Sequence, residues 1–186
     1  MNVYDWDDTI YRGDSTFGLV LYAYVHRPRT LWSIPRTLGC GLLYALHLMP
    51  KQSFKEQLFH MFTMVKDMEE FVEAYTASHM DHVKAWYLAQ QKEDDVIISA
   101  SPEFLIRSFA RRLGIAHVMA SPVDRSTGKY QGENCHGEEK VRRYREVYGT
   151  QPIDQFYSDS RSDTPLARLA KKAYLVSGDQ LKEWKL

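Results

Sequence analysis

Two aspartates close to the start of the chain, in the run Asp5-Trp6-Asp7-Asp8-Thr9, have a type and spacing that could support chemistry. The apolar pair Val3-Tyr4 before them predicts a short strand that ends at Asp5. Because side chains alternate along an extended strand, Asp5 and Asp7 would point in the same direction. Two neighbouring carboxylates repel each other, and a hard divalent cation with oxygen ligands, such as Mg²⁺, removes that cost. The pattern therefore predicts a magnesium site, and a solvated acidic turn is the alternative.

The two carboxylates suit two different roles in the hydrolysis of a phosphate ester. A carboxylate can attack phosphorus and become an aspartyl phosphate, and we assign this role to Asp5. A second carboxylate can protonate the leaving alcohol and then deprotonate the water that hydrolyses the intermediate, and we assign this role to Asp7. Both residues would also be metal ligands. The pair thus predicts a magnesium-dependent phosphatase that acts on a phosphate monoester.

Two residues further along the chain are placed to bind the phosphate. Ser99 ends the apolar run 96–98 and precedes a predicted helix with Ser101 as its N-cap. The N-terminus of a helix favours an anion. Lys140 lies in the first turn of a helix predicted over residues 138–148, where a lysine opposes the helix dipole but could stabilise a phosphate in the transition state. Taken singly, ordinary turn and surface roles fit Ser99 and Lys140 as well.

Asp159 and Asp163 follow a strand predicted over residues 155–158. We expect Asp159 to complete the metal ligands, and Asp163 either to bind near the metal or to orient Lys140. In an open sheet of parallel strands, ligands bind beyond the carboxyl ends of the strands. Because each of these groups stands at a predicted strand end or helix start, together they predict one site.

The remaining pattern predicts an α/β fold. From residue 95 onward, short apolar runs at 95–99, 117–121, 155–158 and 173–176 alternate with helical segments, which favours a parallel sheet with helical crossovers. The turn-rich segment 124–132 predicts a small hairpin.

An all-helical block separates the first strand from the others. Apolar clusters at helical spacing predict helices over 37–48, 51–65 and 69–91. The predicted architecture is a Rossmann-like parallel sheet core, residues 1–12 and 90–186, with an all-helical cap, residues 13–89, inserted after the first strand.

This order of motifs resembles the haloacid dehalogenase-like phosphatase superfamily. The resemblance covers the whole chain, since a helical cap after the first motif is typical of the phosphoserine-phosphatase-like branch. It implies Mg²⁺ as the cofactor, bound by Asp5, by the backbone carbonyl of Asp7 and by Asp159. The motifs of that superfamily are DxDx[TV], a serine or threonine after the second strand, a lysine, and a paired aspartate loop, matched here by Asp5, Asp7, Ser99, Lys140, Asp159 and Asp163.

The resemblance also bears on the substrate. Phosphoserine phosphatases place an amine-binding glutamate nine residues after the nucleophile, where this chain has Asp14, so we expect Asp14 to be a substrate-binding residue. The segments 134–140 and 157–160 resemble the bacterial phosphatidylglycerophosphatase C branch. The expected substrate is therefore a phosphorylated small metabolite or a lipid head group.

The charge distribution excludes one class of partner and suggests another. The chain has 186 residues and no formal net charge, which argues against nucleic-acid binding. From Arg12 to Lys55, however, six basic residues face one acid, Asp14, for a local charge of +5. This segment is also apolar, which suits peripheral contact with an anionic membrane through the cap. The alternative is that the apolar helices pack on each other and the arginines face water.

The expected location is the cytoplasm, and the inner face of the membrane is kept as a second location. The two cysteines form no disulfide framework. Acidic residues replace the basic and apolar start of a signal peptide, and the longest uncharged apolar stretch, 37–50, is too short to span a bilayer. Two other functions stay open: a phosphotransferase with the same intermediate, and a non-catalytic membrane-surface or partner-binding module. The oligomeric state is left undetermined.

Overall fold

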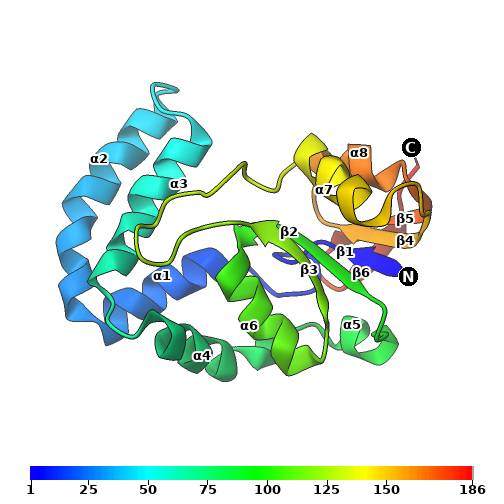
Figure 1. Ribbon diagram of the computed structural model, residues 1–186, viewed down its shortest axis with the longest axis horizontal. Coiled ribbons are helices and arrows are strands. Elements are labelled where there is room, and N and C mark those ends of the chain that lie inside the picture. Colours follow the sequence, from blue (N-terminus) through cyan, green and yellow to red (C-terminus); the bar gives the residue numbers. More distant parts are fainter. Residues whose placement is uncertain (186) are drawn as a thin grey trace.

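A six-stranded sheet in the order β3-β2-β1-β4-β5-β6 forms the centre of the computed structural model, which describes residues 1–185 (Figure 1). β1 to β5 are parallel, and β6 runs antiparallel to β5. The α/β fold predicted from the sequence is therefore confirmed. The strands are β1 (Asn2–Tyr4), β2 (Val96–Pro102), β3 (His117–Ser121), β4 (Ile153–Ser158), β5 (Ala170–Ser177) and β6 (Gln180–Glu183).

β1 is short but central. Val3 pairs with Val96 of β2 on one side and with Phe156 of β4 on the other. All three residues of β1 are buried, as expected for a parallel strand covered on both faces. The backbone N–H of Asp5 extends this pairing by donating to the carbonyl of Tyr157 at 2.9 Å. Asp5 thus leaves the sheet at its carboxyl edge, between the ends of β2 and β4.

Helices cover both faces of the sheet and form the block between β1 and β2. Short 3-10 turns, labelled η, join several of them. The α-helices are α1 (Ser15–His26), α2 (Ile34–Ala45), α3 (Lys51–Phe59), α4 (Met68–Ser78), α5 (Ala85–Gln90), α6 (Glu103–Leu113), α7 (Glu138–Tyr148) and α8 (Thr164–Ala167); the 3-10 helices are η1 (Pro28–Ser33), η2 (His60–Met64), η3 (Met80–His82) and η4 (Arg161–Asp163).

Two hydrophobic clusters lie on opposite faces of the sheet. The larger combines strand residues such as Tyr4 and Ile97 with Leu19 of α1, Tyr75 of α4 and Phe109 of α6. The smaller packs α7 and α8 against the other face. The helical block between β1 and β2 therefore shares its core with the sheet.

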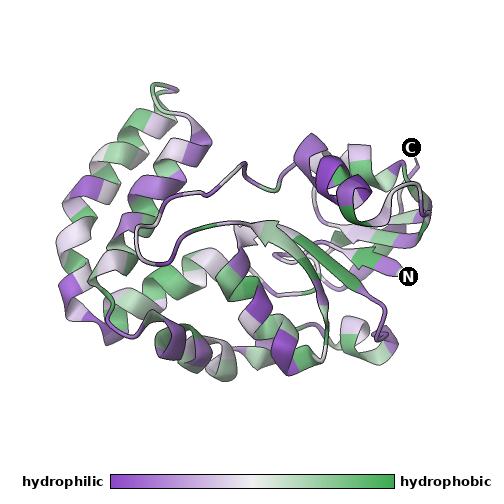
Figure 2. Ribbon diagram, in the orientation of Figure 1, coloured by the Kyte–Doolittle hydropathy of each residue, from purple (hydrophilic) through white to green (hydrophobic). Residues whose placement is uncertain are grey.

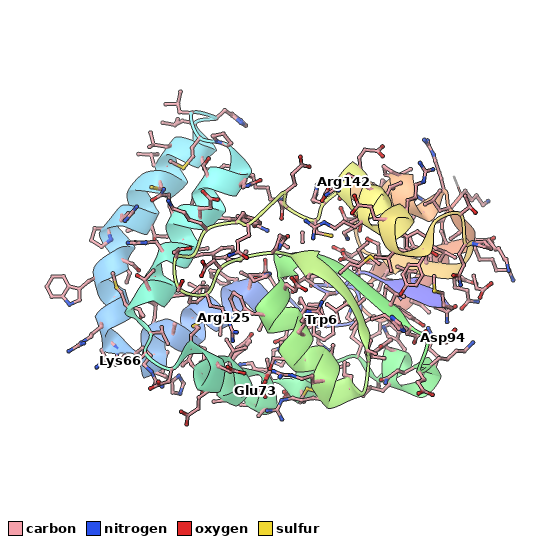
Figure 3. The ribbon with its side chains drawn as sticks, viewed as in Figure 1. Trp6, Lys66, Glu73, Asp94, Arg125 and Arg142 are labelled. Atoms are coloured by element: carbon pink, nitrogen blue, oxygen red, sulfur yellow. The ribbon has the colours of Figure 1, made fainter. Side chains whose placement is uncertain are left out.

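The parts of this block differ in how closely they join the core. α4 is tied to α6 by Glu73, whose carboxylate pairs with Arg111 and, at 2.9 Å, with Arg112 (Glu73 is labelled in Figure 3). In contrast, α2 and α3 form a hairpin that stands away from the sheet (Figure 1), and α2 buries none of its residues. The division into a core, residues 1–12 and 90–186, and a cap, residues 13–89, stays a proposal.

The single helix predicted over residues 69–91 is wrong. The structure breaks it into α4, η3 and α5, because residues 82–84 pair with the loop after β1. The N–H of Arg12 donates to the carbonyl of His82 at 2.9 Å, and that of Lys84 donates to the carbonyl of Ile10 at 2.8 Å. Tertiary pairing here overrides a continuous helical pattern.

One other predicted helix needs correction, and one strand was missed. The helix predicted over 51–65 ends at Phe59 and continues as η2. The small hairpin predicted over 124–132 is present as one antiparallel bridge, between Val123 and Tyr130, that closes the turn. β6 was missed, although Gly178-Asp179 between two short extended runs is a typical two-residue hairpin signal.

Candidate active site

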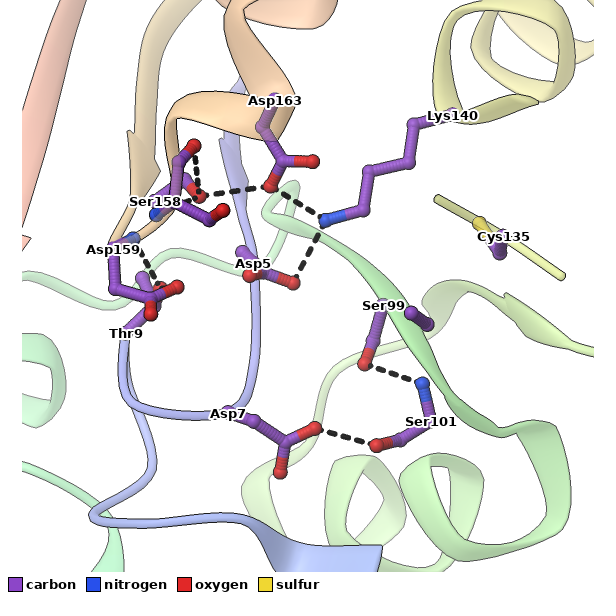
Figure 4. A network of polar contacts seen from close by, with 12 residues as sticks. Asp5, Asp7, Thr9, Ser99, Ser101, Cys135, Lys140, Ser158, Asp159 and Asp163 are labelled. Atoms are coloured by element: carbon purple, nitrogen blue, oxygen red, sulfur yellow. Dashed lines mark hydrogen bonds and ion pairs between the residues drawn. The ribbon is translucent and has the colours of Figure 1, made fainter. Parts of the chain in front are cut away.

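A buried lysine joins two of the predicted site residues (Figure 4). The Nζ atom of Lys140, in the first turn of α7, lies 2.9 Å from Oδ1 of Asp5 and 2.7 Å from Oδ2 of Asp163. Lys140 and Asp163 are almost fully buried. Burial disfavours the ammonium, but the two carboxylates outweigh it and raise the pKa of Lys140. Lys140 is thus held as a cation beside Asp5.

The ionised form of Asp5 is disfavoured even beside the Lys140 cation. Burial raises the pKa of Asp5 to about 7, although the charge of Lys140 opposes this shift and that of Asp163 adds to it. A further positive charge at this site would favour the ionised form.

The side chain of Asp7 lines the same pocket as Asp5 but is held by serines rather than by Lys140 (Figure 4). Its Oδ1 accepts hydrogen bonds from the N–H and the hydroxyl of Ser15, both at 2.6 Å, and its Oδ2 accepts one from the Ser101 hydroxyl at 2.5 Å. Burial, followed by the charge of Asp14, raises the pKa of Asp7 to about 6, and the two serines oppose the shift. Asp7 is therefore a carboxyl that can change protonation near neutral pH.

The segment around Ser99 corrects a predicted cap. β2 continues through a register shift to Pro102, and α6 begins at Glu103 without a side-chain cap. Ser101 is not the N-cap, because its hydroxyl bonds to Asp7 instead. The Ser99 hydroxyl accepts from the N–H of Ser101 at 3.1 Å, and this turn faces the same pocket as Asp5.

Asp159 follows β4 and is held by a residue of the first motif. The Thr9 hydroxyl donates to Oδ1 of Asp159 at 3.4 Å, and the N–H of Asp159 donates to the Thr9 oxygen at 2.9 Å. Burial, and then the nearby charge of Asp8, raises the pKa of Asp159. The loop after β1 and the loop after β4 are joined directly at this point.

These residues can be tested for their fit to Mg²⁺. Asp5 and Asp159 line one pocket, and burial raises the pKa of each. A bound cation would stabilise both carboxylates in their ionised form. Among residues 1–185, no three His, Cys, Asp or Glu side chains make a metal cluster by themselves. The side chain of Asp7 is engaged by serines, which leaves its backbone carbonyl as a ligand, and Asp163 is engaged by Lys140. Two carboxylates, a carbonyl and phosphate or water oxygens form a donor set that suits Mg²⁺.

Asp14 also lines the pocket, but it has a structural task as well. It is the N-cap of α1, and its Oδ1 accepts from the N–H of Phe17 at 2.8 Å. The other carboxylate oxygen has no hydrogen bond from any residue between 1 and 185.

Several residues that position the site were not predicted. Ser15 and Ser101 hold Asp7, and the Ser158 hydroxyl donates to Oδ2 of Asp163 at 2.8 Å. Lys84 is buried, and its ammonium donates to the carbonyls of Asp8 at 2.6 Å and Gly178 at 2.7 Å. For the three serines, the only sequence signal is a hydroxyl residue beside a motif. Lys84 has no such signal.

The site opens into a cavity of about 510 Å³. One wall comes from the carboxyl ends of β1, β2 and β4, and the other from α1, α2 and α3. The residues of the second wall are Asp14, Thr16, Phe17, Thr37, Tyr44, Lys51, Phe54, Lys55, Leu58 and Phe59.

The chain is similar in sequence to a curated protein over about half of its length. Over 94 residues the chain is 36% identical to the "Probable phosphatase Rv3661" of Mycobacterium tuberculosis, which covers 47% of this chain and 33% of that protein. The chain therefore spans about a third of the length of this curated relative.

Two solved structures share the fold. A protein of unknown function from Bordetella pertussis superposes with a TM-score of 0.71 at 19% identity, covering 93% of this chain and 87% of the other. A probable phosphoserine phosphatase from Vibrio cholerae does so with a TM-score of 0.64 at 9% identity, covering 92% and 55%. The family profile of haloacid dehalogenase-like hydrolases matches residues 3–168, and the chain belongs to this family.

Proposed function

We propose that the protein is a magnesium-dependent phosphatase that hydrolyses a phosphate monoester through an aspartyl phosphate on Asp5. The single observation that carries this proposal is the placement of Asp5. It stands at the carboxyl edge of the sheet, beside the Lys140 cation and in the same pocket as Ser99, Asp7 and Asp159. The family and the name of the mycobacterial relative support the same class of reaction.

In the proposed reaction each step is assigned to one or two residues. A carboxylate oxygen of Asp5 attacks phosphorus while Asp7 gives its proton to the leaving oxygen. Ser99, through its hydroxyl and adjacent N–H groups, and Lys140 bind the phosphate oxygens and stabilise their charge. Asp7 then takes a proton from water, which attacks phosphorus, breaks the bond to Asp5 and releases phosphate. When bound by Asp5, Asp159 and the Asp7 carbonyl, Mg²⁺ supplies further positive charge at the phosphate.

Removal of Mg²⁺ tests this proposal. We expect chelation to lower kcat/KM by at least about a hundredfold, because a metal of this kind supplies several kcal/mol of charge stabilisation. Added Mg²⁺ should restore the activity fully. The measurement is steady-state hydrolysis of p-nitrophenyl phosphate before and after dialysis against a chelator. Full activity in metal-free protein would contradict the metal requirement.

The hydrogen bond from Ser101 makes a separate prediction about Asp7. Ser101→Ala removes a donor to the ionised carboxylate, so the pKa of Asp7 should rise further above its value of about 6. Since Asp7 acts first as an acid, the alkaline limb of the pH–rate profile should move upward by about one pH unit. Ser108→Ala is the matched control, because Ser108 is buried against Thr76, outside the pocket. An alkaline limb that stays in place would contradict the assignment.

The proposal extends to the substrate and to the acceptor of the phosphoryl group. The substrate is a phosphorylated small metabolite or a lipid head group, and Asp14, which lines the pocket, contributes to its binding. A phosphotransferase would use the same aspartyl phosphate and pass it to an alcohol. Release of inorganic phosphate in equal amount to the alcohol product distinguishes hydrolysis from transfer.

An exposed apolar surface favours contact with a membrane. Leu38 and Leu42 of α2 and Leu46 just after it recur every fourth residue and are more than half exposed, and Trp32 before them is 84% exposed (hydropathy is shown in Figure 2). From Ser15 to Lys55 the chain contains no acidic residue. No helix within residues 1–185 is long and apolar enough to cross a membrane. We propose that this surface docks on an anionic bilayer at the cytoplasmic face.

Vesicle binding tests the docking surface. The protein should sediment with vesicles of anionic phospholipid at low salt but not with neutral vesicles, and Leu38→Glu/Leu42→Glu should abolish this. Val147→Glu is the control, since Val147 is a similarly exposed apolar residue on α7. Vesicle binding should weaken as added salt screens the positive charges of the segment from Arg12 to Lys55. Absence of binding to anionic vesicles, or self-association through this surface, would contradict the proposal.

A further inference from the structure

One face of α3 brings two lysines into the cavity opposite Asp5. Lys51, Phe54, Lys55 and Leu58 all line the cavity, and their spacing of three and four residues places them on one side of the helix. The catalytic roles assigned above use neither lysine.

The position of these lysines is unfavourable for the helix itself. Lys51 is the first residue of α3, whose first turn contains no acidic residue, so its charge adds to the positive end of the helix dipole. Lys51 and Lys55 are four residues apart, a spacing at which like charges repel. Their arrangement therefore needs a reason outside the stability of α3.

No carboxylate within residues 1–185 forms an ion pair with Lys51 or Lys55. Lys55 is half-buried, and its ammonium makes one hydrogen bond, to the carbonyl of Ala100 at 3.2 Å. Ala100 lies between Ser99 and Ser101, so this ammonium stands directly beside the proposed phosphate-binding turn. Burial, and then the charge of Lys51, lowers the pKa of Lys55.

A third basic residue faces the lysines from the core side of the cavity. His136 lines the cavity, and its pKa is lowered by burial and then by the charge of Lys51. The carboxylates whose charge reaches Lys55 are Asp14 and Asp7. Asp7 is held by two serines, and Asp14 caps α1. The positive charges of Lys51 and Lys55 are thus left for a ligand to neutralise, and His136, whose lowered pKa favours the neutral imidazole, can add a hydrogen bond.

We propose that Lys51, Lys55 and His136 form a second anion subsite. The substrate would be a phosphate monoester that carries another negatively charged group, a second phosphate or a phosphodiester, close to the phosphate that is removed. Phe54, stacked with Tyr44 at a ring-centroid distance of 5.2 Å, lines the same wall and would contact an apolar part of such a substrate. This inference rests on the proposed phosphatase function and narrows its substrate.

Matched pairs of substrates test the subsite. The first pair is a hexose bisphosphate and the corresponding hexose monophosphate. The second is short-chain phosphatidylglycerophosphate and short-chain phosphatidic acid, of which only the first carries a phosphodiester besides its phosphate monoester. We expect kcat/KM for the doubly anionic member of at least one pair to be higher by about tenfold or more, as for a charge-assisted contact. The pair with the larger ratio tells whether the second anion belongs to a soluble metabolite or to a lipid.

The variants tie the preference to the lysines. Lys51→Met/Lys55→Met should bring the ratio within each pair close to one, and the single variants Lys51→Gln and Lys55→Gln should each lower it in part. Lys66→Met is the control, because Lys66 is exposed at the end of the cap and outside the cavity (Figure 3), and it should keep the ratio. Hydrolysis with equal rates within both pairs would overturn the subsite and leave the phosphatase in place.

A binding measurement separates the subsite from the reaction. By calorimetry, pyrophosphate should bind the wild-type protein about tenfold more tightly than inorganic phosphate, and Lys51→Met/Lys55→Met should remove this difference. If this result were found without hydrolysis of any substrate, the subsite would stand and the proposed function would fail. Equal binding of the two anions would overturn the subsite regardless of activity.

Discussion

Asp5→Asn is expected to lower kcat by roughly 10⁴-fold or more, as is typical when the nucleophile of a covalent mechanism is removed. The amide of asparagine does not attack phosphorus. It also has a weaker affinity for a divalent cation than a carboxylate, so the substitution removes a metal ligand with the nucleophile.

The fold should survive this substitution. Burial is the main cause that raises the pKa of Asp5, so the site already disfavours the carboxylate, and a neutral side chain avoids that cost. Lys140 keeps Asp163 as a partner. The expected result is a Tm close to that of the wild type, measured by circular dichroism, together with loss of turnover. Asp81→Asn, an exposed carboxylate outside the cavity, is the control for the change in charge. Asp5→Asn with more than a few per cent of wild-type kcat would exclude Asp5 as the nucleophile.

Lys140→Met is expected to damage both stability and catalysis. It removes the cation between two buried carboxylates, and loss of one partner from a buried ion pair costs about 3–5 kcal/mol. For a chain of this length the Tm should fall by roughly 6–20 °C. The kcat should fall by about 10²- to 10³-fold, because a positive charge at the phosphate is lost.

A second substitution shows whether buried charge is the cause. Lys140→Met/Asp163→Asn removes one of the two unpaired carboxylates and should recover a large part of the lost stability without recovering activity. Loss of Lys140 raises the pKa of Asp5 above its wild-type value of about 7, so lowering the pH toward 7 neutralises Asp5 first in the variant and should narrow its difference in stability from the wild type. Lys172→Met, at an exposed position of β5, is the control. Additive losses in the double variant would mean that packing, not charge, explains the effect.

The sequence predicted best those site residues whose position depends on local secondary structure. Asp5 and Asp159 stand just beyond the ends of β1 and β4, and alternation of apolar runs with helical segments was enough to predict this, whereas Ser99 lies within β2 at its register shift. Lys140 could be placed in the first turn of a helix for the same local reason. Asp163 had two open roles, and in the structure it contacts Lys140.

What could not be predicted depends on residues that meet only through tertiary structure. Ser101 donates to Asp7, which lies 94 positions away in the sequence. From the local sequence alone, the same serine is predicted to cap a helix. The break at residues 82–84 comes from pairing with the loop after β1, which a helical pattern in 69–91 does not reveal. The lysines of α3 counted only toward the positive charge of the segment 12–55, because the sequence does not reveal that they line the cavity.

Direct detection of a phosphoenzyme tests the central claim. The protein would be mixed with a labelled monoester and Mg²⁺, quenched in acid within one turnover, and digested, and the phosphorylated peptide would be identified by mass spectrometry. The mechanism predicts one hydroxylamine-sensitive phosphoryl group, located on Asp5 and absent from Asp5→Asn. A phosphoryl group on another residue would contradict the role of Asp5. So would hydrolysis without a burst and without a trapped intermediate, if the same quench traps the intermediate of a known aspartyl-phosphate enzyme.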